Sequence, residues 1–415
     1  KMISYKKSQS LLKKNIIEIK NENILSINAI NKVCAKTVYS NVDFPSANNS
    51  AFDGYAIKSL ETNKATKTNN IKLKILKTIS AGVKPNTPLK KFSCVEIMTG
   101  GLVPKQFDTI LPVEAAKIEK IKNTKYLVIS KKVKKNQHLR LKGSDFKKKE
   151  IIISKGQLIN SSHIFALKTL GIKKIIVKKK PNILLFSTGN EITEKNNIPP
   201  WMVRNSNSYY LGTLKENFSF NYIYGGILRD NDEKTYYTLI KKKLKSNIDI
   251  IISIGAVSAG KYDFVPKIIK KFKTKCYFKG VLIRPGKPIL FSKIQNKSYF
   301  GLPGNPMSAA ACFRFFVYPY LCNILGMKGE KPLSALLQND YTKKKNLTRF
   351  ANSQILFDQK GKLKVKILKD QESFRIKSFL HSNSWTILDQ GKSKFKKGEF
   401  IDCYLQNIPN IHLNR

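Results

Sequence analysis

Three loops in the middle of the chain carry the residue types that hold an anionic ligand. They are 251-IISIGAVSAGKYDF-264, 284-RPGKP-288 and 301-GLPGNP-306, and each follows or contains an apolar run rich in β-branched residues. Such runs are typical of strands, so the loops are expected where strands end. Glycines let the backbone approach a phosphate, and the helix that follows offers free NH groups to it. The loops predict an α/β pocket for a phosphorylated, anionic small molecule.

The first loop offers four candidate ligand-binding residues. Gly255 and Gly260 flank a short turn and allow close backbone approach, and Ser258 can donate to an oxyanion. Asp263 begins the next helix, where it either caps that helix or binds a metal ion or a pterin-like donor. The spacing alone leaves both roles of Asp263 open.

The other two loops add cations and a second helix start. Arg284 and Lys287 lie about one turn apart on a loop stiffened by prolines, which suits a pyrophosphate or an oxyanion such as molybdate or sulfate. Pro303 and Pro306 bracket a Gly-Asn turn directly before a helix, which builds an anion-receptive helix start. A solvated basic turn and an ordinary helix entry stay open as alternatives.

Acidic residues at turns suggest a role for a divalent cation. Glu191 follows a strand-end glycine in 187-STGNE-191, and Asp53, Thr99 and Asp145 follow turns nearer the N-terminus. One acid at a turn is usually structural, but several beside a basic pocket favour Mg²⁺-assisted phosphate chemistry, with Glu191 and Asp263 as candidate ligands. Because the chain has no G-x-S-x-G elbow, Walker loop or convincing Cys–His pair, we expect positioning and electrostatics rather than a protein nucleophile.

The overall charge points elsewhere, toward nucleic acid, but its distribution argues against that class. The chain has 415 residues, with 77 Lys and Arg against 27 Asp and Glu, a formal net charge of +50. Only 8 of the 77 are arginine, the residue that reads phosphates and bases bidentately, and the lysines are spread along the whole chain. The abundance of Lys, Asn and Ile is what an AT-rich genome would impose. We therefore expect no specific nucleic-acid partner.

The cysteine, histidine and hydropathy patterns indicate a reducing, cytoplasmic setting. Six scattered cysteines form no CxxC pair, and four histidines form no cluster, so we expect free thiols and no zinc site. The sequence contains neither a signal-peptide pattern at its start nor eighteen consecutive apolar residues, and we expect no membrane partner.

The elements that must position these residues divide into several regions. A helix is expected over 9–35, short strands and turns over about 41–147, and a further helix over 161–170. From residue 181 strands and helices alternate, with strands at 182–189, 221–228 and 248–255, a hairpin over 288–302, and helices at 206–218, 234–245, 263–272 and 307–325. Ser206 is the expected N-cap of the helix over 206–218. Such alternation predicts a mostly parallel sheet with ligands at the carboxyl ends of its strands, and the remaining short strands predict a small barrel or sandwich.

The motifs together identify a resemblance. The segments 48-NNSAFDGYAI-57, 97-IMTGGLVP-104, 139-LRLKGSD-145, 185-LFSTGNEI-192, 205-NSN-207, 285-PGKP-288 and 302-LPGNPMSA-309, with the first loop, resemble the molybdopterin molybdenumtransferases. This is the MoeA family, to which the C-terminal domain of gephyrin also belongs. The resemblance covers roughly residues 8–405 and implies an elongated α/β multidomain homodimer. Its expected parts are a helical dimerisation segment (8–40 plus 148–178), a β-rich insertion (41–147), a mostly parallel α/β molybdopterin-binding domain (179–326) and a C-terminal β-barrel (327–415).

The resemblance also implies a reaction, its partners and its site. Molybdate is inserted into adenylylated molybdopterin and AMP leaves in a Mg²⁺-dependent step, with molybdopterin adenylyltransferase and recipient molybdoenzymes as partners. The cleft would join the α/β domain of one subunit to the insertion of the other. Asp53, Thr99 and Asp145 would face it from the insertion. The residues implied on the other side are Glu191, Asn207, Asp249, Asp263, Lys287, Pro303, Pro306 and, from the C-terminal region, Ser373.

Several residues depart from the family pattern, and we expect each to lower ligand affinity. They are Ser144, Asn190, Ala256, Arg284, Asn352 (where an arginine is expected) and Glu372. Two other functions remain open. One is a molybdopterin adenylyltransferase, which uses a similar α/β domain. The other is a basic binding or scaffold protein that kept the fold and lost the activity, and its polyanion binding should collapse as salt is raised.

Overall fold

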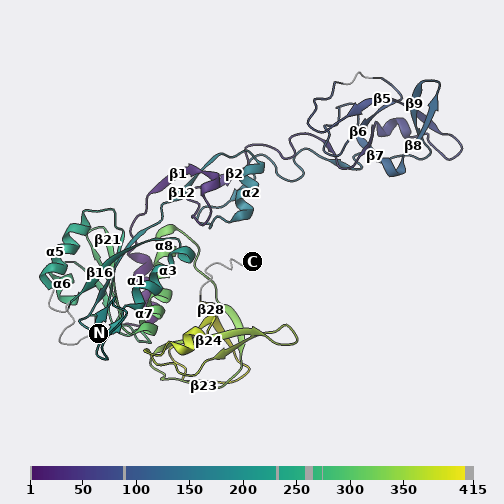
Figure 1. The fold of residues 1–415 in the computed structure, drawn as a ribbon. Coiled ribbons are helices and arrows are strands. Elements are labelled where there is room, and N and C mark those ends of the chain that lie inside the picture. Colours follow the sequence, from purple (N-terminus) through teal and green to yellow (C-terminus); the bar gives the residue numbers. More distant parts are fainter. Residues whose placement is uncertain (1, 87–89, 230–232, 258–264, 273, 407–415) are drawn as a thin grey trace.

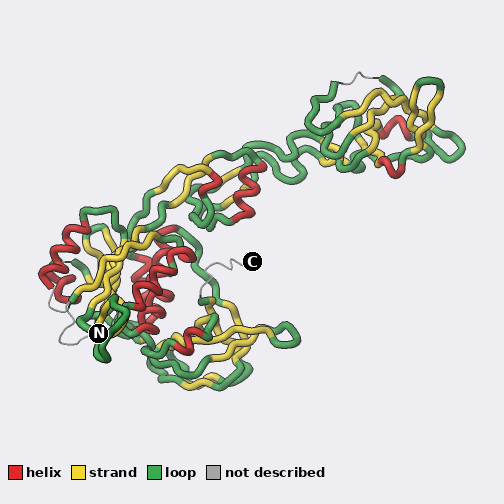
Figure 2. Tube along the Cα trace, viewed as in Figure 1, coloured by secondary structure: helices red, strands yellow, loops and turns green. Residues whose placement is uncertain are grey.

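The computed structural model describes residues 2–86, 90–229, 233–257, 265–272 and 274–406. The chain is elongated (Figure 1). A β-rich module lies at one end, an α/β domain and a β-barrel lie together at the other, and a smaller module joins them. Figure 2 shows that helices concentrate in the α/β domain, whereas the distal β-rich module and the β-barrel consist mostly of strands and loops. These features confirm the expected multidomain α/β fold.

The distal β-rich module is built on one six-stranded sheet with the order β7-β4-β6-β5-β9-β8. Its strands are β4 (Gly54–Ile57), β5 (Ile71–Ile79), β6 (Ser93–Ile97), β7 (Thr109–Pro112), β8 (Lys117–Ile121) and β9 (Thr124–Ile129), with 3₁₀ turns η2 (Ser59–Thr62) and η3 (Val113–Ala115). The short ladder of β3 (Asn49–Ser50) and β10 (Leu139–Arg140) connects it to the rest of the chain. Two small apolar cores, one on each face of the sheet, hold the module together.

The joining module is mainly a set of short antiparallel ladders. It consists of β1 (Asn21–Leu25) paired with β12 (Lys174–Lys178), β2 (Val38–Tyr39) paired with β11 (Ile151–Ile153), η1 (Ser26–Asn28) and helix α2 (Ser161–Thr169). The helix expected over 9–35 is wrong beyond its first part, because α1 (Tyr5–Lys14) ends early and packs in the α/β core. Ile17 and Ile19 are buried, whereas Leu25 and Ile27 are exposed. The apolar residues after α1 therefore follow no single helical face.

The α/β domain contains a six-stranded sheet with the order β16-β13-β17-β21-β20-β18. Its strands are β13 (Asn182–Thr188), β16 (Asn221–Leu228), β17 (Ile250–Ile254), β18 (Cys276–Lys279), β20 (Leu290–Ile294) and β21 (Lys297–Leu302). The first four in spatial order are parallel, and β20 runs antiparallel to both of its neighbours in the sheet, β21 and β18. β17 is buried along its whole length, as an apolar run covered on both faces must be.

Helices cover both faces of this sheet. One face packs against α1, α3 (Ser206–Thr213), α4 (Lys215–Phe218), α7 (Pro306–Cys312) and α8 (Tyr318–Leu325), and the other against α5 (Glu233–Leu244) and α6 (Val265–Lys271). A turn of π-helix, η4 (Phe313–Val317), joins α7 to α8. Among the described residues, one helical stretch, Pro306–Leu325, passes the length and hydropathy test for a membrane span, with a mean hydropathy of 1.2. Because 89% of that apolar window is buried in the protein, the stretch is a core helix.

The C-terminal region forms the expected barrel. Its strands are β22 (Leu333–Leu337), β24 (Thr348–Phe357), β25 (Leu363–Ile367), β26 (Ser384–Leu388) and β28 (Phe400–Leu405), accompanied by β19 (Ile283–Arg284), β23 (Tyr341–Thr342), β27 (Lys394–Phe395) and helix α9 (Lys377–Leu380). The ladder runs β24-β25-β22-β28-β26, and the pairing of β26 with β24 closes it. β19 pairs with β24, so the α/β domain and the barrel share a sheet edge.

Candidate functional site

A hollow of about 660 Å³ lies at the carboxyl edge of the parallel sheet. β13, β17 and β21 end there, and the antiparallel β20 begins there, so loops far apart in sequence meet at one place. Residues from six segments line it: 187–189 with 191–192, 203–207, 254–257, 288, 303–306 and 374. The edge where the sequence predicted an anion pocket therefore carries a real cavity.

The structure brings several of the predicted residues together. Glu191, Asn207, Gly255, Pro303 and Pro306 all line the hollow. Each belongs to a separate strand-end loop or helix start, except the two prolines that bracket one turn. Their convergence was the main geometric expectation from the sequence.

Ser373 approaches the same hollow from the C-terminal region. Its Oγ accepts a hydrogen bond of 3.0 Å from Asn305 Nδ2, and its carbonyl accepts one of 3.0 Å from the Met307 backbone NH. These contacts fix the segment that carries Ser373 and Phe374 against the start of α7. The hollow is thus closed on one side by the C-terminal region.

The two cations of the 284–288 loop differ in position. Lys287 is exposed and directly precedes Pro288, which lines the hollow. Arg284 instead lines a separate pocket of about 220 Å³ together with Arg349 and Glu372. The expectation that Arg284 and Lys287 act as one pair in the hollow is therefore corrected for Arg284. The reason is that Arg284 belongs to β19, which pairs with the barrel strand β24 and points the chain toward the barrel.

Asp249 lies at the opposite edge of the sheet. It directly precedes β17, and its Oδ2 accepts a hydrogen bond of 2.8 Å from the Asn182 backbone NH at the start of β13. A five-residue strand spans about 16 Å, which separates Asp249 from Gly255 by the length of β17. Its expected place beside the other site residues is corrected, because a residue before a parallel strand cannot reach the carboxyl edge.

The remaining predicted residues lie elsewhere or outside the described part. Ser258, Gly260 and Asp263 are outside the described residues, so their roles stay predictions. Asp145 is exposed near the base of the distal module, where its backbone NH donates to the Phe44 carbonyl over 3.1 Å. Asp145 therefore lies outside the hollow of its own chain.

Asp53 and Thr99 form a hydrogen-bonded pair in the distal module. Asp53 Oδ1 accepts from the Thr99 backbone NH over 2.6 Å and from Thr99 Oγ1 over 2.8 Å. The hydrogen bond from the Thr99 backbone NH is the main cause that lowers the pKa of the Asp53 carboxyl below its usual value, and the bond from the Thr99 hydroxyl adds to it. Figure 1 shows that the module carrying this pair is remote from the α/β domain of the same chain. The Asp53 carboxyl therefore stays ionised, but the pair cannot reach the hollow of its own subunit.

Arg229 holds the loop that presents Glu191, and no motif in the sequence indicates this role. Its guanidinium Nη1 donates to the carbonyls of Gly189, Asn190 and Ile192 over 3.2, 2.8 and 2.9 Å. Gly189 has a φ of +139°, and a Cβ there would lie 2.6 Å from the Glu191 carboxylate. Within the part of the chain that the structure describes, that carboxylate has no hydrogen-bond or ion-pair partner. The backbone of the loop is held in place, and the exposed carboxylate is available to a ligand.

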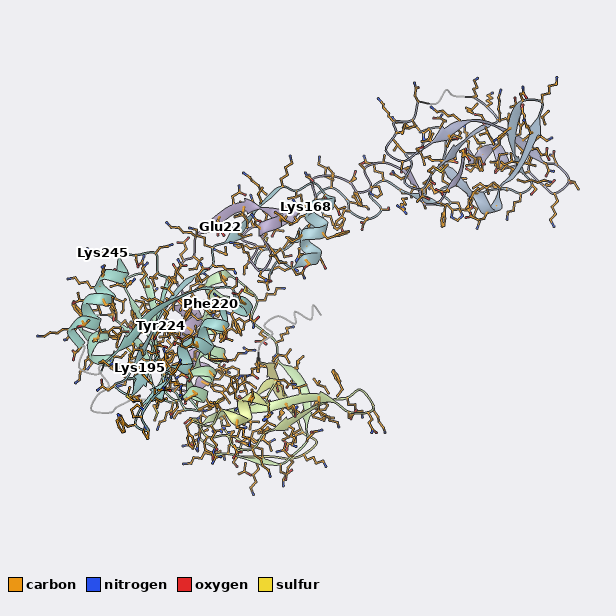
Figure 3. All side chains as sticks on the ribbon, in the orientation of Figure 1. Glu22, Lys168, Lys195, Phe220, Tyr224 and Lys245 are labelled. Carbon is orange, nitrogen blue, oxygen red and sulfur yellow. The ribbon has the colours of Figure 1, made fainter. Side chains whose placement is uncertain are left out.

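A second unpredicted feature is the network around Glu194. Its carboxylate accepts from Asn205 Nδ2 over 2.6 Å, Tyr224 OH over 2.8 Å and Tyr209 OH over 2.9 Å. Burial acts to raise the pKa of Glu194, but these three hydrogen bonds outweigh it and lower the pKa. Figure 3 shows Tyr224 within the α/β domain.

Asn205 connects this network to the wall of the hollow. Its Oδ1 accepts from Ser187 Oγ over 2.8 Å, and both residues line the hollow. Asn205, rather than the expected Ser206, is the N-cap residue of α3, but its side chain makes no capping bond. The helix expected over 206–218 also breaks into α3 and α4. The first NH groups of α3 are therefore not occupied by this cap.

One departure from the family pattern, Asn352, lies within the barrel. Asn352 is buried in β24, where its Nδ2 donates to Ser378 Oγ over 3.2 Å and its Oδ1 has no partner among the described residues. Arg349, three residues earlier on the same strand, supplies a buried guanidinium next to Arg284. Burial is the main cause that lowers the pKa of Arg349. Arg349 does not take the place of the arginine expected at 352, because side chains three residues apart in a strand point to opposite faces.

The floor of the hollow is formed by backbone at Gly255 and Ala256. Gly255 has a φ of +95°, and a Cβ there would lie 2.6 Å from both the carbonyl oxygen and Oγ1 of Thr188. Ala256 has a φ of +51°, in the left-handed region that costs a residue with a Cβ about 1–2 kcal/mol. The family pattern that the sequence resembles has glycine here, as the second of a Gly-Gly pair, so alanine at 256 places backbone strain at the floor.

The substitution Ala256→Gly is expected to raise the free energy of unfolding by about 1 kcal/mol, because glycine adopts this conformation without strain. Ala309→Gly in α7 is the matched control and is expected to lower it by about 1 kcal/mol, since its backbone is helical. Urea denaturation of both variants provides the measurement. Equal destabilisation by the two substitutions would contradict the strain at Ala256.

Comparisons with known proteins agree with this geometry. A family model described as "MoeA N-terminal region (domain I and II)" matches residues 3–171, and one described as "Probable molybdopterin binding domain" matches residues 184–323. A molybdopterin molybdenumtransferase of Staphylococcus epidermidis is 29% identical over 406 residues, covering 97% of this chain and 95% of the relative. One of Staphylococcus aureus is 29% identical over 381 residues, covering 91% and 89%. The crystal structure of a molybdopterin biosynthesis MoeA protein of Pyrococcus horikoshii OT3 has a TM-score of 0.83 and 26% identity, covering 98% of this chain and 100% of that chain.

Proposed function

Because this chain belongs to the MoeA family, we propose that it inserts molybdate into adenylylated molybdopterin and releases AMP in a Mg²⁺-dependent step. It is a transferase of molybdenum cofactor biosynthesis. The observation that carries the finer proposal is the convergence of Glu191, Gly255 and the 303–306 turn on one hollow at the carboxyl edge of the sheet.

The residues of the hollow can bind and orient such a substrate. Gly255 and Gly304 carry no side chain, so a phosphate can approach their backbone. A Cβ built on Gly304 would lie 3.7 Å from Gly255 Cα, which shows that the two loops meet at this place. Lys287 lies exposed beside Pro288 and can neutralise an oxyanion that enters. Catalysis then depends on holding molybdate and the bound substrate in contact, with charge stabilised by fixed groups.

The residues present fit a magnesium ion of the kind that binds phosphates. Mg²⁺ usually takes one or two carboxylates together with substrate phosphates, so a single available carboxylate at Glu191 is sufficient from this side. No group of three or more His, Cys, Asp or Glu side chains that could hold a metal occurs among the described residues. Mg²⁺ would supply charge neutralisation at the diphosphate when AMP leaves. Glu191 would orient the ion, with Asp263 as the second proposed ligand.

We also propose a homodimer in which each hollow is completed by the other subunit. The support is that the module carrying Asp53 and Thr99 lies at the opposite end of the elongated chain from the α/β domain (Figure 1). Their carboxylate–hydroxyl pair is preorganised and exposed, as a group awaiting a ligand should be. Molybdopterin adenylyltransferase as the source of substrate, recipient molybdoenzymes as acceptors and a cytoplasmic location belong to the same proposal.

The test is direct measurement of AMP release. Full-length protein supplied with adenylylated molybdopterin, molybdate and Mg²⁺ is expected to release AMP, and omission of molybdate or Mg²⁺ should stop the release. Bound substrate without any AMP release would overturn the proposal. ATP consumption in the absence of molybdate would instead identify an adenylyltransferase.

A further inference from the structure

A short parallel ladder places Glu194 beside Asn205. β14 (Ile192–Thr193) pairs in parallel with β15 (Val203–Arg204), and their last residues face each other. Glu194 and Asn205 are the next residue after each strand, so the ladder brings their side chains together. Asn205 is 5% exposed and lines the hollow, whereas Glu194 is exposed and is not among the described residues that line it. Glu194 therefore lies behind the wall of the hollow.

The Glu194 carboxylate determines which way the Asn205 amide faces, because an ionised carboxylate only accepts hydrogen bonds. Both protons of Asn205 Nδ2 are donated, one to Glu194 Oε1 over 2.6 Å and one to Tyr224 OH over 2.7 Å. Tyr224 OH donates its own proton to the same Glu194 oxygen over 2.8 Å. The amide oxygen of Asn205 must then face the opposite way, toward Ser187.

The orientation of this amide sets the hydrogen-bonding role of Ser187, which is 3% exposed and lines the hollow. The Ser187 hydroxyl has one proton, and it donates that proton to Asn205 Oδ1 over 2.8 Å. Ser187 Oγ therefore offers the hollow only its lone pairs, and this part of the wall accepts hydrogen bonds. If the amide turned over, its NH₂ group would donate to Ser187 Oγ and the hydroxyl proton would be released toward the hollow.

We propose that Glu194 is a positioning residue, which holds the Asn205 amide in this orientation and thereby fixes the polarity of the wall at Ser187. The inference rests on the proposed function, because it takes the hollow as the place where the substrate binds. Without the carboxylate, Asn205 has an ordinary alternative. It occupies the N-cap position of α3, where an asparagine side-chain oxygen usually accepts from the first backbone NH groups of the helix, yet it makes no such bond. Glu194 is the group that holds Asn205 away from that role.

Positions 194 and 205 can carry only one negative charge between them. Their polar atoms lie 2.6 Å apart, and two ionised carboxylates at that distance repel each other. The single variant Asn205→Asp would therefore disturb the wall. In the double variant Glu194→Gln with Asn205→Asp, the new amide can donate to the new carboxylate, whose second oxygen still accepts from Ser187 Oγ. Exchanging the two side-chain types thus keeps the hydrogen-bonding role of Ser187.

The experiment measures the affinity of full-length protein for adenylylated molybdopterin by equilibrium dialysis, and kcat by AMP release at saturating substrate. Glu194→Ala and Asn205→Asp are each expected to weaken binding about tenfold, because a hydrogen-bonding group of the wall is then mismatched. Adding Glu194→Gln to Asn205→Asp is expected to restore the affinity to within about threefold of wild type.

The value of kcat separates positioning from a direct role in the reaction. It should change by less than about threefold in Glu194→Ala, because Glu194 lies behind the wall and acts through Asn205. Glu216→Ala is the matched control, since the Glu216 side chain is 76% exposed on α4 and is not among the described residues that line the hollow. Its affinity and kcat should both equal those of wild type.

Three results would overturn the positioning role. They are unchanged affinity in Glu194→Ala, failure of Glu194→Gln to improve the Asn205→Asp variant, and an equal fall of affinity and kcat in Glu194→Ala, which would indicate general loosening of the site. The proposed reaction fails separately. The expected pattern of affinities in a protein that never releases AMP would support the role of Glu194 while refuting the reaction, and AMP release with equal affinities in all variants would refute only the role of Glu194. A wild-type protein that does not bind the substrate would refute both.

Discussion

Replacing Glu191 with glutamine is expected to lower the rate of AMP release by about 100-fold or more while substrate binding is retained. The substitution keeps the shape of the side chain and removes its charge. Arg229 fixes the backbone of the loop, so the amide should occupy the same position as the carboxylate. The loss would then fall on charge-dependent steps, measured as kcat against KM in the AMP-release assay. A rate within twofold of wild type would refute the assignment of Glu191.

The matched control is Glu216→Gln, at a side chain on α4 that is 76% exposed. It does not line the hollow and should leave AMP release unchanged.

A mixing experiment then tests whether Glu191 and Asp53 act in trans. If one site combines Glu191 of one subunit with Asp53 of the other, random exchange of Glu191→Gln and Asp53→Asn subunits restores about a quarter of wild-type activity, because half the dimers regain one intact site of two. Failure of exchanged subunits to regain activity would contradict a shared site.

Replacing Arg314 with methionine is expected to lower the free energy of unfolding by about 3 kcal/mol or more. The Arg314 side chain is 5% exposed and pairs with Glu330, which is 15% exposed, through Nη2 at 2.8 and 2.7 Å from the two carboxylate oxygens. It also donates to the Leu405 carbonyl of β28, which connects the long helical stretch to the barrel. The rings of Tyr318 and Tyr404 lie 5.2 and 5.6 Å from the guanidinium. Methionine would leave the Glu330 carboxylate partly buried without this partner.

Trp385 provides the measurement for this variant. It is 1% exposed in β26, whereas Trp201, the other tryptophan, is 75% exposed. Urea unfolding followed by tryptophan emission therefore reports mainly on the barrel. Arg375→Met is the control, because the Arg375 side chain is 47% exposed, its contacts are surface ion pairs and the exposed Phe374 ring, and its loss should cost less than about 1 kcal/mol. Equal effects of the two substitutions would show that the buried pair does not stabilise the barrel.

The sequence was most informative where chemistry depends on local loop geometry. Glycines and prolines at strand ends predicted the hollow, because such loops carry their conformation in their own residues. Glu191, Gly255 and Pro303 were found this way, and the hollow gathers all three. The alternating strands and helices after residue 181 likewise specify a parallel sheet by their periodicity.

The sequence was less informative where a residue acts through partners distant in the chain. Arg229 and Glu194 have no motif around them, and their roles depend on hydrogen bonds that only the folded chain creates. Asp249 was the opposite case. The resemblance implied that it lines the site, but it directly precedes β17 and therefore lies at the edge of the sheet opposite the hollow. The prediction of one helix over 9–35 was wrong, because the apolar residues after Lys14 pack in the cores of two different modules.

The length of the joining module determines where the distal module lies. The chain crosses it twice, outward through β1 and β2 and back through β11 and β12, before and after the distal sheet. Its length therefore sets how far the Asp53 carboxylate stands from its own α/β domain. One inserted strand residue would move that carboxylate by about 3.3 Å, more than a hydrogen bond can absorb. A change in the number of residues in these strands is therefore expected to displace Asp53 more than a change of one exposed side chain in the module.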